Sequence, residues 1–264
     1  MAQLSVRLLG TFQVSLDSQP VTGFESNKVR ALLAYLVVES GQPHLRQKLA
    51  DLLWPDLPAR RSTTNLNQAL YNLRKVICDH QVDPAFLLRT QESLQFNPHS
   101  DYWLDVEAFQ SGLSQTFSWE QPSSALKHQD IAGLQAIVEL YKGDFLGGMD
   151  FDVGPAFDEW RLVVQQRLQQ GMIEYLHQLA EAYANQGEIT PALSYARRQV
   201  EIDPLCEPAH RQLMRLLAES GQRSQALVQF KRLQVVLAEE LNITPEPQTQ
   251  ALRDQIRNQD HITA

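Results

Sequence analysis

The N-terminal residues contain two short segments in which apolar and polar side chains alternate. These segments, 4–9 and 12–16, are rich in Leu, Val and Phe, and alternation with a period of two is typical of a β-strand with one buried face. Residues 17–20, with the sequence Asp-Ser-Gln-Pro, have the chemistry of a turn. The sequence therefore predicts a small antiparallel sheet at the N-terminus.

Beyond this sheet the apolar positions change to a helical period. In residues 27–39, 46–54 and 59–78 the apolar side chains recur every three or four positions. Gly41 and Pro55 follow the first two of these segments and are expected to end them. Three helices joined by short connections, of which the last is long, are typical of a helix-turn-helix unit.

A hairpin is expected directly after the third helix. Residues 86–96 contain two strand-like runs on either side of Gln91-Glu92-Ser93. A hairpin in this place distinguishes a winged helix from a plain three-helix unit. Residues 111–131 are rich in Ser and Gln and lack periodicity, so we expect the junction between two domains there.

The remaining residues are predicted to be helical and contain an internal repeat. Residues 175–199 align with the segment that begins at about residue 209, and the offset of 34 residues superposes Leu179 on Leu213, Gly187 on Gly221 and Ala192 on Ala226. This offset is the period of a tetratricopeptide repeat. A small residue near the start of the second helix lets the two helices of such a unit approach closely. Ordinary helical hairpins of similar length are the alternative.

The net charge of −8 is distributed unevenly along the chain. Residues 1–99 hold 10 basic and 8 acidic residues, whereas residues 100–264 hold 13 basic and 23 acidic residues. The first part is therefore net +2 and the second net −10. Because phosphate repels an acidic surface, any contact with nucleic acid is confined to a local basic surface of the first part.

The third predicted helix has an outer face suited to DNA. With its leucines turned toward the core, the opposite face carries Arg61, Thr64, Gln68, Tyr71 and Lys75, flanked by Arg60, Asn67, Arg74, Asn65 and Asn72. No carboxylate occurs between Ala59 and Ile77. Arg and Lys neutralise phosphate or bind guanine, and Asn and Gln pair with adenine. A merely solvated face would normally mix Glu with Lys and Arg.

Other polar residues of the first part are candidate contacts to the DNA backbone. They are Lys28 and Arg30 on the first helix, Arg46 and Lys48 on the second, and Arg89 and Thr90 beside the hairpin. Scattered cations also serve simply to solubilise a surface. Trp54, next to a leucine-rich helix, is expected in the core rather than as a platform for a base.

Enzymatic, metal and membrane functions find no support in the sequence. The nucleophile, zinc-protease and dinucleotide-binding motifs are absent, and the seven histidines are dispersed. Cys78 and Cys206 are far apart and predict neither a disulfide nor a thiolate site. We expect no catalytic residues, no cofactor and no metal. With no signal-like or membrane-spanning run of apolar residues, a cytoplasmic protein is expected.

The chain resembles the SARP family of bacterial activators. In the first part the resemblance lies in VRLLGTFQV, KVRALLAYLV, LADLLWPD and NLNQALYNLRKVI; in the second part it lies in YKGDFLGG (141–148), DEWR (158–161), DPLCEPAHRQLMRLLAESG (203–221) and LAEELNITPEPQT, which ends at Thr249. These segments cover nearly the whole chain in the family's order. The hairpin departs from the family pattern, with Ser93-Leu94 where a Gly-Tyr pair is common.

The resemblance implies an OmpR-type winged-helix DNA-binding domain over residues 1–110 and a bacterial transcriptional activation domain over 111–264. The expected fold is mainly α: an N-terminal winged helix-turn-helix with small antiparallel β elements, and a C-terminal all-α tetratricopeptide-like repeat domain. Larger relatives append an ATPase module, so the chain is either a whole small regulator or the front part of a longer one. His210 and Arg211 are expected to build the junction between repeats rather than to bind a ligand.

The sequence favours an activator that binds double-stranded promoter DNA, with the third helix in the major groove and the hairpin near the minor groove. Recruitment of RNA polymerase is implied by the resemblance alone. Two protomers are expected to bind direct repeats, because one such helix reads few base pairs. The alternative is a helical-repeat adaptor whose N-terminal module binds protein instead of DNA. The salt dependence of DNA binding separates the two.

Overall fold

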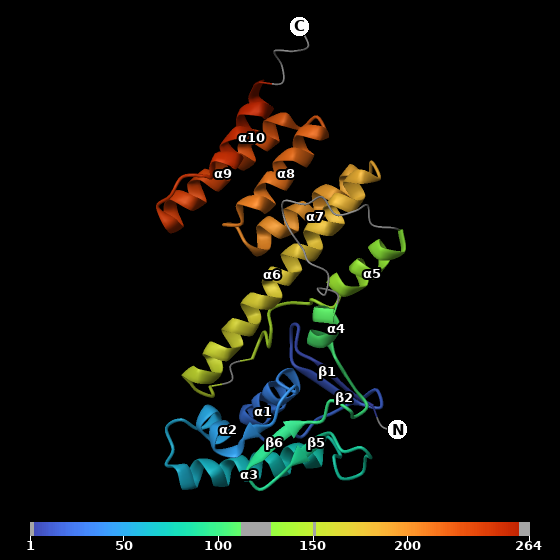
Figure 1. The fold of residues 1–264 in the computed structure, drawn as a ribbon, viewed down its shortest axis with the longest axis vertical. Helices are drawn as coiled ribbons and strands as arrows, with labels where there is room; N and C mark the ends of the chain where they lie inside the picture. Colours follow the sequence, from blue (N-terminus) through green and yellow to red (C-terminus); the bar gives the residue numbers. More distant parts are fainter. Residues whose placement is uncertain (1–2, 112–127, 150–151, 259–264) are drawn as a thin grey trace. The chain divides into compact units, whose positions relative to one another are not determined.

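The structure, a computed structural model, describes residues 3–111, 128–149 and 152–258 (Figure 1). The chain divides into two compact units, each described here by itself. The first comprises Met1–Gly112 and Leu140–Leu168, and the second comprises Leu113–Glu139 and Gln169–Ala264. The junction expected at 111–131 lies largely outside the described residues.

A four-stranded sheet opens the first unit. Strands β1 (Leu4–Arg7) and β2 (Gln13–Leu16) form the predicted antiparallel hairpin. Only the first half of the expected turn is a turn, because β3 (Gln19–Pro20) pairs with β2 on the sheet's edge. The fourth strand, β7 (Tyr102–Leu104), pairs with β1 in parallel. One strand pair of this sheet thus departs from the expected antiparallel arrangement.

The three predicted helices are confirmed as α1 (Asn27–Val38), α2 (Arg46–Leu53) and α3 (Ala59–Val76). Helix α1 is buried on most of its circumference. Helix α3 is amphipathic and places its leucines in the core, namely Leu66, Leu70 and Leu73. The leucine spacing therefore fixes which side of α3 faces the solvent.

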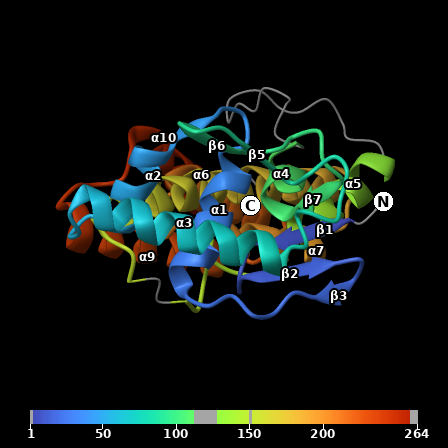
Figure 2. The same ribbon diagram turned by 90° about the horizontal axis from the view of Figure 1, so that it is seen from below.

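The predicted hairpin is also confirmed. Strand β5 (Leu87–Arg89) pairs antiparallel with β6 (Ser93–Phe96), and β4 (His44–Leu45) joins β6 on its other side. The wing is thus a three-stranded sheet. Figure 2 shows α2, α3 and strands β5 and β6, all of which belong to the first unit.

A buried carboxylate joins the start of α4 to the residues that follow β1. Asp105 begins the short helix α4 (Asp105–Ser111) directly after β7. Its side chain is 2% exposed and accepts hydrogen bonds from the backbone N–H groups of Leu8 and Leu9 at 2.8–2.9 Å. Burial raises the pKa of Asp105 despite these bonds.

Residues 140–168, which the sequence groups with the second domain, pack in the first unit. The backbone N–H of Leu146 donates to the carbonyl of Leu8 at 2.8 Å, and Phe145 forms a β-bridge with Leu9. The ring of Trp160 contacts Tyr35 on α1, and its Nε1 donates to the Glu39 carboxylate at 2.9 Å. The YKGDFLGG and DEWR segments thus pack on the N-terminal elements.

Among the described residues of the second unit, the regular secondary structure is entirely α-helical. It contains α5 (His128–Val138), the C-terminal part of α6 (Pro155–Asn185), α7 (Ile189–Ile202), α8 (Glu207–Glu219), α9 (Arg223–Leu241) and α10 (Pro247–Asn258). Successive helices from α7 to α10 pack side by side (Figure 1). Their core contains small residues, among them Ala192 and Ala226, which are fully buried.

The 34-residue repeat is visible in the backbone. Helices α6 and α8 end two residues before Gly187 and Gly221, whose φ angles are 79° and 78°. The N–H of Gly187 bonds to the carbonyl of Ala184, and the N–H of the next residue bonds to Tyr183. The equivalent two bonds form at Gly221. This glycine-terminated helix end repeats with the same geometry, as expected for tetratricopeptide-like units.

The junction between α8 and its neighbours is built from polar side chains. His210 is 2% exposed, and its Nε2 lies 3.0 Å from the carbonyl of Pro204. Gln229 on α9 donates from its Nε2 to Nδ1 of His210 at 2.9 Å. Burial lowers the pKa of His210, which favours its neutral form. Its ring nitrogens are occupied by the protein, in agreement with the junction role.

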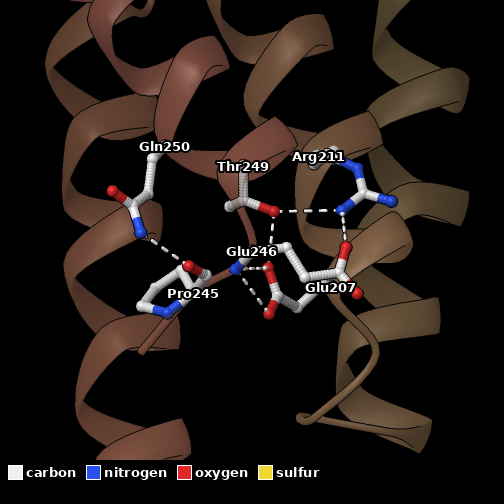
Figure 3. A network of polar contacts seen from close by, with 6 residues as sticks. All are labelled: Glu207, Arg211, Pro245, Glu246, Thr249 and Gln250. Carbon is white, nitrogen blue, oxygen red and sulfur yellow. Dashed lines mark hydrogen bonds and ion pairs between the residues drawn. The ribbon is translucent and has the colours of Figure 1, made fainter. Parts of the chain in front are cut away.

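A second network ties α8 to the start of α10 (Figure 3). The Glu207 carboxylate accepts hydrogen bonds from the backbone N–H of Glu246 at 3.0 Å and from the Thr249 hydroxyl at 2.5 Å. Arg211 donates to Glu246 at 2.8 Å and to Thr249 at 3.0 Å. Gln250 donates to the carbonyl of Pro245 at 2.7 Å. The DPLCEPAHR and NITPEPQT segments therefore meet in one contact.

Candidate nucleic-acid interface

The connection between α2 and α3 is held by α1. Lys28 donates from Nζ to the carbonyl of Leu53 at 2.8 Å and lies 5.5 Å from the centre of the Trp54 ring. Trp54 is half-buried and does not lie in the core as expected. After Pro58 the chain turns directly into α3, where the N–H of Arg61 bonds to the carbonyl of Pro58 at 2.7 Å. This packing fixes where α3 begins.

The outer face of α3 is exposed to solvent over its length. Its exposed side chains are Arg60, Arg61, Thr64, Asn67, Gln68, Tyr71 and Lys75. Tyr71 is 69% exposed, which is unusual for so large a ring in a folded domain. Together they form an acid-free set of cations, amides and hydroxyls.

Two predicted residues of α3 are less accessible. Asn65 is half-buried. Asn72 is 3% exposed, its Oδ1 accepts from the N–H of Glu25 at 3.2 Å, and its Nδ2 donates to the carbonyl of Gly23 at 3.2 Å. The expectation that Asn72 flanks the exposed face is therefore wrong. The segment before α1 covers this side chain, and the Asn72 amide holds that segment through these two hydrogen bonds.

Arg74 is partly engaged inside the protein. Its Nε donates to Asp79 Oδ2 at 2.8 Å, and Asp79 is 2% exposed. The other oxygen of Asp79 accepts from the N–H of Leu87 at 3.0 Å, at the start of β5. Arg74 and Asp79 thus connect the end of α3 to the wing. The sequence pattern did not reveal Asp79, because it lies beyond the helical period.

Hydrogen bonds orient two further side chains of the face. The Thr64 hydroxyl donates to the carbonyl of Arg60 at 2.9 Å, which leaves its methyl group and its two lone pairs for other contacts. Asn67 accepts from Arg46 on α2 at 2.6 Å, and its amide N–H groups remain donors. The bond between α2 and α3 reduces the rotational freedom of both side chains.

The wing contributes one exposed cation and one structural hydroxyl. Arg89, at the end of β5, is exposed. The Thr90 hydroxyl accepts hydrogen bonds from the backbone N–H groups of Ser93 at 2.8 Å and Glu92 at 3.2 Å. Thr90 therefore shapes the turn of the hairpin.

The other predicted cations differ in availability. Lys28 is committed to the end of α2, and Arg30 donates to Asn27 at 2.6 Å and lies over the ring of Phe24. Lys48 is exposed on α2. Of the cations predicted outside α3 as contacts to the DNA backbone, Lys48 and Arg89 are the exposed ones.

The described residues contain no group of three or more His, Cys, Asp or Glu side chains that could hold a metal ion. In this part of the chain no helix is both long and apolar enough to cross a membrane.

Known proteins that are similar to this chain are transcriptional regulators. Residues 104–257 match the family described as the bacterial transcriptional activator domain. The chain is 25% identical over 263 residues to the transcriptional regulatory protein EmbR of Mycobacterium tuberculosis, covering 99% of this chain and 65% of EmbR. It is 26% identical over 239 residues to the regulatory protein AfsR of Streptomyces coelicolor, covering 90% of this chain and 23% of AfsR.

A solved structure is also similar. It is that of Mycobacterium tuberculosis EmbR in complex with a low-affinity phosphopeptide, with a TM-score of 0.79 and 23% sequence identity. The match covers 98% of this chain and 66% of EmbR. At this identity the likeness shows the fold, which combines a winged helix-turn-helix with a helical repeat domain.

Proposed function

The chain belongs to the bacterial transcriptional activator domain family, as a SARP-family transcriptional regulator, and from this premise we propose that it is a sequence-specific DNA-binding activator. Residues 1–110 would bind promoter DNA, and residues 111–264 would make the activating contacts, with RNA polymerase as the partner. The site of action would be the cytoplasm. Two protomers would bind direct repeats.

The observation that carries this proposal is the exposed, acid-free face of α3 in a helix-turn-helix with a wing. In such units the recognition helix, which corresponds here to α3, enters the major groove and reads the edges of bases. Gln68 and Asn67 would read bases, and Arg61 and Lys75, near the two ends of the face, would contact phosphate. Arg60, Thr64, Asn65, Tyr71 and Arg89 would complete the surface. Arg74 would act mainly by positioning the wing.

The test begins with operator sequences selected by the full chain from a random DNA pool. Replacing Gln68 by Ala should weaken operator binding by about 1–3 kcal/mol and relax specificity at one base pair. Replacing Lys75 by Ala should weaken all sequences alike and lower the slope of log affinity against log salt by about 1.

The matched control is Lys231→Ala, which removes an exposed lysine of α9 in the second unit. It should change neither the affinity nor the salt slope. If the pool yields no enriched sequence and binding does not depend on salt, the chain is a helical-repeat adaptor and the proposal fails. An unchanged affinity after replacing Arg61, Gln68, Tyr71 and Lys75 together would contradict the assignment to α3.

A further inference from the structure

The outer face of the N-terminal sheet carries a hollow that the DNA-binding proposal does not use. Its volume is about 420 Å³, within the range of small-molecule sites. It lies on the face of β1 and β2 opposite the core, where Ser5 pairs with Ser15 and Arg7 pairs with Gln13. Two small serines in register leave the space that larger side chains would fill.

The walls of the hollow are apolar and come from the segments around the strands. Phe12 and Phe24 meet edge to face, with ring centres 5.5 Å apart. Pro20, at the end of β3, and Val21, directly after it, continue the wall. The site therefore combines a polar floor with an aromatic side, the arrangement that holds a small molecule with one apolar and one polar end.

The charged side chains that line the hollow are all positive. Arg7 and Arg30 line it, and no Asp or Glu does. Arg30 lies over the Phe24 ring at 5.7 Å, and Arg7 over the Trp103 ring at 5.5 Å. Among the described residues neither guanidinium forms an ion pair with a carboxylate. Both positive charges would therefore be available to an anion bound in the hollow. Guanidinium groups bind carboxylates and other oxyanions with paired, directional hydrogen bonds.

We propose that this hollow binds a small organic anion with an aromatic body. The ring packs against Phe12 and Phe24, and the acidic group reaches Arg30 and Arg7, with the hydroxyls of Ser5 and Ser15 as further donors. The wall segment is also linked to α3, because Asn72 of α3 bonds to the carbonyl of Gly23 and the N–H of Glu25. A ligand here would contact the segment that holds α3.

The experiment uses anilinonaphthalene sulfonate as the anionic probe and N-phenylnaphthylamine as its uncharged counterpart, each titrated into the full chain by fluorescence. The anionic probe should bind at least about tenfold more tightly than the neutral one, and Arg30→Gln should remove most of that difference, as expected for a charged hydrogen bond. Ser15→Leu should fill the hollow and weaken both probes.

The matched control is Arg232→Gln, which removes an arginine from a separate hollow in the second unit and should leave binding unchanged. Far-UV circular dichroism checks that each variant is folded. Equal binding of the two probes, or unchanged binding in both Arg30→Gln and Ser15→Leu, overturns the proposal. Displacement of the probe by an oligoglutamate peptide at lower concentration than by free naphthoate would assign the hollow to an acidic protein segment instead.

Discussion

Glu207 shows how one side chain can hold two distant segments together. Its carboxylate is 7% exposed and is satisfied by the N–H of Glu246 and the hydroxyl of Thr249 (Figure 3). A buried carboxylate is tolerated only where such donors replace the water it loses. The position therefore requires an acceptor, and the segments at 203–207 and 245–249 have a structural role.

Replacing Glu207 by Ala should lower the free energy of unfolding of the second unit by about 2–4 kcal/mol, because hydrogen bonds to a charged group are lost and donors are left buried. Glu219→Ala is the control. The Glu219 side chain is 46% exposed, and its surface ion pair with Arg215 should contribute less than about 1 kcal/mol. Urea unfolding followed by circular dichroism measures both. Equal effects of the two changes would contradict the structural role.

Two histidines, the buried His210 and the half-buried His177, should make stability depend on pH. Burial lowers the pKa of His177 to about 4, although Glu181 opposes the shift, and burial also lowers the pKa of His210. The unfolded chain binds protons on these rings below its pKa of about 6.5, whereas the folded chain does not. The stability that depends on these neutral rings is therefore fully present above pH 6.5 and is lost as the pH falls toward 4. For His177 the free energy of unfolding falls by at most about 3 kcal/mol.

The measurement compares unfolding free energies between pH 7 and pH 4.5. Because burial raises the pKa of Asp105, that residue acts in the opposite direction, and the comparison is made between variants. The double change His177→Gln with His210→Gln should flatten the curve relative to His99→Gln, which alters an exposed ring. Parallel curves for the two proteins would rule out the histidines as the cause.

At the scale of elements, the periodic helices and the two local hairpins were predicted well, whereas two strands whose partners are distant in sequence were not. The helices expected at 27–39, 46–54 and 59–78 begin where predicted and end within two residues of the expected position. Strands β4 and β7 were missed, since two or three residues cannot display a period and their partners are distant in sequence. Pairing of this kind is decided by tertiary structure.

The same limit applies to the candidate surface on α3. The leucine spacing correctly placed Arg61, Gln68 and Lys75 in solvent. It misplaced Asn72, because a helical wheel cannot show that the segment before α1 covers that side of the helix. The bond between Arg74 and Asp79 was equally invisible, since it depends on the path of the chain after α3.

The repeat ends provide a test of backbone geometry at this scale. Gly187 and Gly221 adopt the left-handed region, and a Cβ added at either position would meet no atom within 4 Å. Substitution by Ala should therefore cost only the backbone strain, about 1 kcal/mol at each site. The two losses should be equal if the repeats are equivalent.

Gly41→Ala is the control, since its added Cβ also meets open space but its backbone lies outside the left-handed region. It should leave stability unchanged or raise it slightly by restricting the unfolded chain. Thermal unfolding of the three variants checks these values. A loss at Gly41 as large as at Gly187 would show that the added methyl group, and not the backbone angle, is responsible.

At the scale of the whole molecule, the division of charge restricts how DNA can be bound. Residues 100–264 carry a net charge of −10 and are repelled by phosphate, whereas residues 1–99 are net +2. Since that excess is small, affinity would depend on the local set of cations around α3 rather than on the net charge of the chain. A second protomer is the simplest way to increase both affinity and specificity.

The last prediction concerns two protomers on one operator. Helix α3 has 18 residues and is about 27 Å long, and one such helix reads too few base pairs to select a promoter from a genome. We therefore expect direct repeats whose half-sites are spaced by about one helical turn, roughly 10–11 base pairs, so that both protomers bind the same face of the duplex. Inserting about five base pairs should abolish cooperative binding, and inserting about ten should restore part of it.

Gel-shift and sedimentation measurements on these spacer variants give affinity and stoichiometry together. The control is a single half-site, which should bind one protomer weakly whatever sequence surrounds it. Because a five-base-pair insertion turns one protomer to the far side of the duplex while leaving every base contact intact, its effect isolates the contact between protomers from the reading of DNA. A complex of one protomer per operator, with the same affinity on every spacer, would leave a monomeric activator whose specificity comes from α3 and the wing alone.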